Sequence, residues 1–203
     1  MKENQSKFLS SKEIAKIRNY LQKESESALI RNNKVAIKNQ CIFEILFGSG
    51  ARVSEIARLK IAHLNLNKNT PSIFIERGKW GSSGVVWINE NLRILIKRYI
   101  KWKKERGYKV SDNDYLFDSN NKHISTRAIQ YSFKKLINSL GISMHYSVHS
   151  IRHSYASHLY AKSKDIVLVS KQLRHSRVST TQDIYTAILP EIAVKAVSCL
   201  YKK

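Results

Sequence analysis

Apolar residues recur at helical spacing along nearly the whole chain, and sequence typical of β-strands interrupts this pattern clearly only once. The interruption consists of residues 72–76 and 85–88, two short runs rich in β-branched and aromatic residues. The polar, glycine-rich stretch RGKWGSSG joins them, as expected for a hairpin. With two prolines and seven glycines in 203 residues, no segment is a convincing linker. The sequence therefore predicts one mainly helical domain with a small antiparallel hairpin or sheet on one side, an α+β fold.

Capping signals indicate where the helices begin and end. Ser10 and Glu13 have capping-box spacing and open a first helix. A second helix is expected over residues 27–47, ended by the glycines of Gly48-Ser49-Gly50, and a short one over residues 52–59. After the hairpin a helix is expected from residue 89 onward. Further helices are expected over residues 125–140, 147–161, 165–173 and 179–188, and after Pro190.

The charge balance points to a polyanionic partner. Thirty-six Lys and Arg against 15 Asp and Glu give a formal net charge of +21. Such an excess of positive charge repels itself in a compact protein, and it is larger than a merely solvated basic surface would explain. Double-stranded DNA is therefore the expected partner. A membrane is not expected, because no run approaches ~20 apolar residues and no basic amphipathic helix stands apart. The N-terminus is too polar for a signal peptide, which favours the cytoplasm over secretion. The two cysteines lie in apolar contexts, so the sequence predicts neither a disulfide framework nor a metal site.

Several residues suited to phosphate chemistry follow one another along the chain. Arg52 comes just after a glycine turn, at the start of a helix, and Glu55 lies three residues on, where it can brace that arginine. His149 and Arg152 share one face of a helix. Taken singly, each is more simply explained as an ordinary structural or DNA-contacting residue. Their arrangement, together with the residues that follow them, makes a catalytic interpretation stronger.

In order, the segments GARVSE, HSIRHSYASHL, LRHS and STTQDIYT resemble those of the tyrosine recombinase family, the lambda-integrase-type or phage integrase proteins. The resemblance extends from about Leu9 to the C-terminus. It implies a nucleophilic tyrosine surrounded by basic residues. The residues that it assigns to the catalytic site are Arg52, Lys79, His149, Arg152, His175 and the nucleophile Tyr185.

Physical chemistry gives these residues distinct roles. Two arginines can neutralise the charge that develops on the non-bridging phosphate oxygens, and His175 can add a hydrogen bond. Tyr185, with an ordinary pKa of ~10, must lose its proton as it attacks, and His149 is the candidate acceptor. Lys79 is the candidate general acid for the departing 5′ oxygen. The product would be a 3′-phosphotyrosine, so religation needs no metal, ATP or other cofactor.

Some assignments stay open within this scheme. Lys60, Lys68 and Arg77 are alternatives to Lys79 as the general acid. Tyr185 lies ten positions after His175, one more than in Xer-type members. Arg174 stands where the family usually has glycine, and it either adds a phosphate contact or constrains the end of the preceding helix. Glu55 is expected to support the site without taking part in the reaction.

The chain resembles the short, single-domain members of the family, such as the fimbrial phase-switch recombinases. Residues 1–8 are expected to form a polar arm and residues 9–203 the catalytic domain. The segment 190–201 reads as a helix with one apolar face, which either packs on its own domain or is swapped into a neighbouring protomer of a homotetramer on DNA. The half of the DNA clamp that longer members carry is either absent or supplied by a second protomer, an accessory protein or a second recombinase.

The leading hypothesis is site-specific recombination, with integration, inversion or resolution as the outcome. A type IB topoisomerase would use the same chemistry without exchanging strands. The short length, the STTQDIYT segment and the apolar tail favour recombination over relaxation. A non-catalytic DNA-binding regulator is the third alternative, and it would predict a broken set of catalytic residues, whereas none is missing here.

Overall fold

Polar side chains begin most of the helices in the computed structural model, which describes residues 8–31, 33–76, 83–119 and 122–174. Ser10 and Glu13 form the predicted capping box at the start of α1 (Ser11–Arg31): the Ser10 amide donates to the Glu13 carboxylate, and the Glu13 amide donates to the Ser10 hydroxyl. Asn89 caps α4 (Glu90–Glu105) in the same way, through its side-chain oxygen. Further along, Ser125, Ser147 and Asp165 cap α5 (Thr126–Ser139), α6 (Val148–Ser163) and α7 (Ile166–Leu173).

The boundary between the first two helices differs from the prediction. Residues 27–31 continue α1 and do not open the second helix, which is α2 (Lys34–Ser49). Asn33 sets the boundary, because its side-chain oxygen accepts hydrogen bonds from the amides of Val35 and Ala36. The prediction from residue 27 was wrong because apolar spacing runs on across the break, and only this local cap ends one helix and starts the next.

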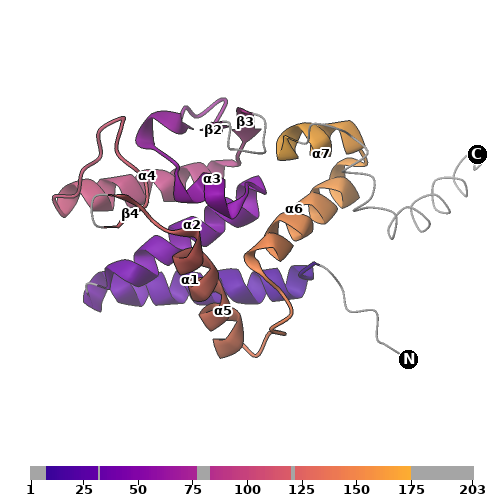
Figure 1. Cartoon of the computed structure of the whole chain (residues 1–203), viewed down its shortest axis with the longest axis horizontal. Helices are drawn as coiled ribbons and strands as arrows, with labels where there is room; N and C mark the ends of the chain where they lie inside the picture. Colours follow the sequence, from indigo (N-terminus) through magenta and orange to yellow (C-terminus); the bar gives the residue numbers. More distant parts are fainter. Residues whose placement is uncertain (1–7, 32, 77–82, 120–121, 175–203) are drawn as a thin grey trace, which may run out of the picture.

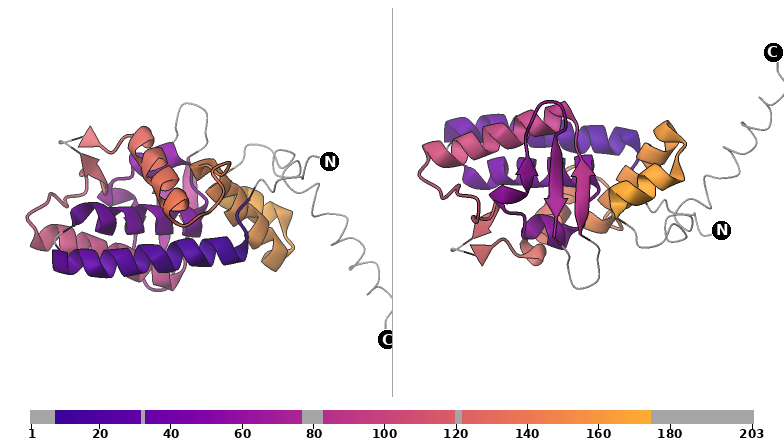
Figure 2. Two further views of the ribbon diagram at one scale, coloured as in Figure 1. Left: turned by 90° about the horizontal axis from the view of Figure 1, so that it is seen from below. Right: turned by 90° about the horizontal axis from the view of Figure 1, so that it is seen from above.

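The predicted hairpin is confirmed, and it is part of a larger sheet. β2 (Ser72–Ile75) and β3 (Gly84–Trp87) pair antiparallel, with Ile73 opposite Val86. β1 (Leu64–Asn65) adds a third antiparallel strand beside β2. Figure 2 shows this sheet on one side of the helices, with β3 beside α7. The mainly helical α+β fold class is therefore confirmed.

A second, smaller sheet was not anticipated. It consists of β4 (Asp118–Ser119) and β5 (Lys122–His123), which follow α4. The strands of this sheet and β1 have two residues each, too few for a period-two pattern to show in a sequence.

The core forms around α2, which contacts α1, α4, α5 and α6 (Figure 1). Its middle turns bury apolar side chains on every side, including Ile42, Phe43 and Ile45. Cys41 is buried among them, as the sequence predicts. Because α2 is held from all sides, its C-terminal end is a rigid support for the turn that follows. Among the residues that the structure describes, no helix is long and apolar enough to cross a membrane.

Candidate active site

The glycine turn at the end of α2 places Arg52. Gly50 caps the helix with φ 62° and ψ 14°, in the left-handed region, and its amide donates to the carbonyl of Leu46. The Ser49 hydroxyl donates to the carbonyl of Ile45 and accepts from the amide of Ala51. The chain then enters α3 (Val53–Ala57) with Arg52 as its N-cap residue. The Arg52 side chain keeps 34% of its surface exposed, so it can reach a ligand.

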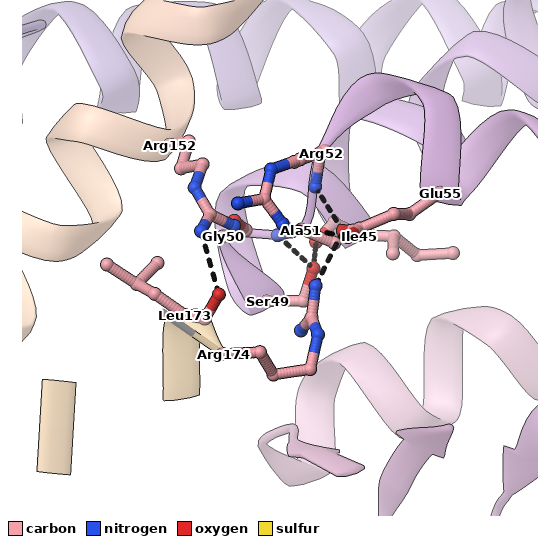
Figure 3. A network of polar contacts seen from close by, with 9 residues as sticks. All are labelled: Ile45, Ser49, Gly50, Ala51, Arg52, Glu55, Arg152, Leu173 and Arg174. Carbon is pink, nitrogen blue, oxygen red and sulfur yellow. Dashed lines mark hydrogen bonds and ion pairs between the residues drawn. The ribbon is translucent and has the colours of Figure 1, made fainter. Parts of the chain in front are cut away.

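Arg152 joins three elements that lie far apart in the sequence. One guanidinium nitrogen (Nη1) donates to the carbonyl of Gly50 at 2.7 Å, and the other (Nη2) donates to the carbonyl of Leu173 at 2.7 Å. The residue is only 5% exposed. Figure 3 shows its guanidinium between the turn after α2 and the end of α7. The planar fork of an arginine suits two acceptors on different sides, which a lysine could not serve in the same way.

Glu55 lies between two arginines. Its Oε2 accepts the backbone N–H of Arg52 at 2.6 Å and a guanidinium N–H of Arg174 at 2.6 Å, while its Oε1 accepts from the Arg52 guanidinium at 3.1 Å. Burial raises the pKa of the Glu55 carboxyl, but the Arg174 charge and the hydrogen bonds from Arg52 and Arg174 outweigh burial, so the pKa lies below its ordinary value. The carboxylate is therefore charged at neutral pH and holds Arg52 in place.

His149 lies in the first turn of α6, one turn before Arg152, and remains exposed. Its ring stands nearly perpendicular to that of His153, with the ring centroids 4.7 Å apart. Partial burial of the ring lowers the pKa of His149, and the positive charges of Arg152 and Arg52 lower it further. The imidazole is therefore neutral at pH 7 and able to accept a proton.

The titration of His149 tests this local field. We expect its midpoint, followed by NMR of the imidazole, to lie below the ordinary value of about 6.5 in the DNA-free protein. Replacing the partly exposed Arg52 (R52Q) removes one of the positive charges and should raise the His149 midpoint. His158 is a matched control on the same helix, because burial and Lys162 lower its pKa. A shift of both histidines, or of neither, would contradict the placement of Arg52 beside His149.

Three of the sequence-predicted residues, Lys79, His175 and Tyr185, lie outside the described residues. The structure brings the other catalytic candidates, Arg52, His149 and Arg152, together with Glu55 around the Gly50 turn. Within the described part of the chain, no group of three or more His, Cys, Asp or Glu side chains could hold a metal ion.

Gln172 carried no assigned place in the sequence prediction, and Arg174 carried two alternative ones. The Gln172 side chain pairs with both backbone groups of Trp87, at 3.1 Å and 2.8 Å, and so ties α7 to β3. Arg174 is the C-cap of α7, with φ 53°. The only signal available for Arg174 was the glycine usual at its position, which is what a left-handed C-cap favours. Of the two alternatives for Arg174, its buried contact with Glu55 favours the constraint on the helix end.

Comparisons with known proteins show what this chain is similar to. The model of the phage integrase family matches residues 7–191. Tyrosine recombinase XerC of Salmonella typhi is 34% identical over 156 residues, which cover 76% of this chain and 50% of the relative. Tyrosine recombinase XerA of Pyrococcus horikoshii is 31% identical over 156 residues, covering 75% of this chain and 51% of the relative. The chain thus spans about half the length of the curated relatives that it matches.

Solved structures show the same fold. The XerH site-specific recombinase, bound to palindromic difH substrate in a post-cleavage complex, superposes with a TM-score of 0.77 at 26% identity, covering 96% of this chain and 53% of that one. The crystal structure of XerA recombinase gives a TM-score of 0.73 at 25% identity, covering 97% of this chain and 65% of that one.

Proposed function

Because this chain belongs to the phage integrase family, we propose that it is a site-specific DNA recombinase that cuts and rejoins double-stranded DNA through a 3′-phosphotyrosine bond to Tyr185. The observation that carries this proposal is the pair of arginines at the Gly50 turn. Arg152 donates to the carbonyl of Gly50, and Arg52 follows that glycine by two residues, braced by Glu55. Both arginines thus belong to one hydrogen-bonded unit, with the neutral His149 close by.

This arrangement suits transfer of a phosphoryl group. Arg52 and Arg152 would neutralise the non-bridging oxygens of the scissile phosphate as its negative charge increases. The Tyr185 oxygen would attack phosphorus, and its proton would pass to neutral His149. Lys79 would donate a proton to the 5′ oxygen that leaves, and His175 would add a hydrogen bond to the phosphate. The bond energy is kept in the phosphotyrosine, so these steps need no metal or ATP.

We also propose the assembly on DNA. The excess of basic residues supports DNA as the partner, and the XerH structure is that of a recombinase bound to its DNA substrate. Strand exchange needs two DNA sites, so a homotetramer is the expected assembly. The helix proposed for residues 190–201 would cross between protomers, and an accessory protein or a second recombinase is a further candidate partner. A DNA substrate also favours the cytoplasm as the location.

The test is covalent capture of DNA. Nicked duplexes that carry short inverted repeats from the DNA flanking the gene are incubated with the protein and separated on denaturing gels. We expect an adduct with the wild-type protein and none with Y185F, because only the tyrosine oxygen forms the bond. No adduct on any duplex, or an adduct that survives Y185F, would refute the proposal. Relaxation of plasmids without exchange between sites would indicate a type IB topoisomerase.

A further inference from the structure

Arg174 occupies a backbone position that favours glycine. As the C-cap of α7 it has φ 53° and ψ 46°, in the left-handed region, where a side chain strains the backbone. Its side chain is also only 3% exposed, although it carries a charge. Backbone strain and a buried charge both oppose folding, so an arginine here requires specific compensating contacts.

The compensating contacts lead to both arginines of the candidate site. The Arg174 guanidinium donates to Glu55 Oε2 at 2.6 Å, the oxygen that also accepts the Arg52 backbone N–H. The residue before it, Leu173, supplies the carbonyl to which Arg152 donates. Consecutive residues at the end of α7 therefore hold one arginine directly and the other through Glu55 (Figure 3).

The stem of Arg174 also reaches the sheet. A Cβ atom added at Gly84 would lie 3.1 Å from Arg174 Cδ, so the stem packs closely against the first residue of β3. Gly84 directly follows the connection that carries Lys79. The end of α7 is thus packed against the base of the hairpin while it is paired with α3.

We propose that Arg174 is a positioning residue that sets the relative placement of Arg52 and Arg152 by clamping Glu55 to the end of α7. The inference rests on the proposed function, because it assigns those two arginines to one phosphate. Glycine at this position would relieve the backbone but would leave Glu55 joined to Arg52 alone. Arg52 could then move with the carboxylate, independently of Leu173 and Arg152.

The decisive variant is R174G, because it removes the guanidinium while improving the backbone. Its matched control is K164G at the C-cap of α6, where Lys164 has φ 56° and is exposed. Both variants replace a basic left-handed C-cap residue by glycine, so they share the loss of one positive charge and the relief of strain. We expect adduct formation at saturating DNA to slow about ten- to a hundredfold in R174G and to stay unchanged in K164G. DNA affinity should change equally in the two.

Two further measurements separate positioning from general stability. R174K keeps the positive charge and a donor group for Glu55, although not the planar guanidinium, and should recover part of the rate. The Glu55 carboxyl, followed by carbon-13 NMR in DNA-free protein, should titrate at higher pH in R174G than in the wild type, because a neighbouring positive charge is gone.

The possible results are distinct. Equal cleavage rates in R174G and K164G, or an unmoved Glu55 titration, would overturn the assignment of Arg174. Failure of the wild-type protein to form any adduct would overturn the proposed function, whereas the Glu55 titration would still decide whether the clamp exists.

Discussion

R152A should abolish detectable DNA cleavage and lower the free energy of unfolding by about 2–4 kcal/mol. The substitution removes both donors that satisfy the carbonyls of Gly50 and Leu173, and each buried carbonyl left without a donor costs on the order of 1–3 kcal/mol. It also removes a charge that would stabilise the transition state, and loss of one such group typically slows a reaction about 10²- to 10³-fold. Urea unfolding and the DNA-adduct assay measure the two effects.

Two companion variants separate the causes of that loss. R152K keeps a positive charge but not the planar fork, so it should still slow cleavage strongly while losing less stability. R98A removes one positive charge from the exposed face of α4 and should leave both measurements close to wild type. If R152A cleaves DNA at the rate of R98A, then Arg152 has no part in the reaction.

Among glycine-to-alanine substitutions at the described glycines, G50A should lower the free energy of unfolding most. At φ 62° an alanine costs about 1 kcal/mol, and its Cβ would overlap the ring of Tyr155 and press on Leu173. Overlap in a packed region adds roughly 1–3 kcal/mol, so we expect a total loss of about 2–4 kcal/mol. Cleavage should fall as well, because the carbonyl that anchors Arg152 belongs to the displaced residue.

G141A is the matched control for this prediction. Gly141 has the same φ of 62°, and a Cβ there would meet nothing within 4 Å. Its loss of stability should be about 1 kcal/mol, the backbone contribution alone. Equal losses in G50A and G141A, measured by urea unfolding, would show that the close approach of Gly50 to Tyr155 carries no energetic weight.

Local chemistry made much of the fold predictable. The helices from α4 to α7 could be placed because polar caps such as Asn89 and Asp165 bond to amides within three residues, which a sequence displays directly. The hairpin could be placed because β2 and β3 are long enough to show strand composition. The break at Asn33 could not be placed, because apolar spacing continues across it. The two-residue strands could not be placed either, because they are too short to show a pattern.

The sequence by itself determined the family and predicted which residues would do chemistry, through the order and spacing of GARVSE, HSIRH, LRHS and the segment that ends at Tyr185. Only the tertiary structure decided what holds the arginines. The two carbonyls that accept from Arg152 lie 102 and 21 residues away along the chain, and the carboxylate paired with Arg174 lies 119 residues away. Every residue has a backbone carbonyl, so the sequence does not indicate which carbonyls Arg152 will contact. That depends on how α2, α6 and α7 pack. The role inferred for Arg174 follows from that packing.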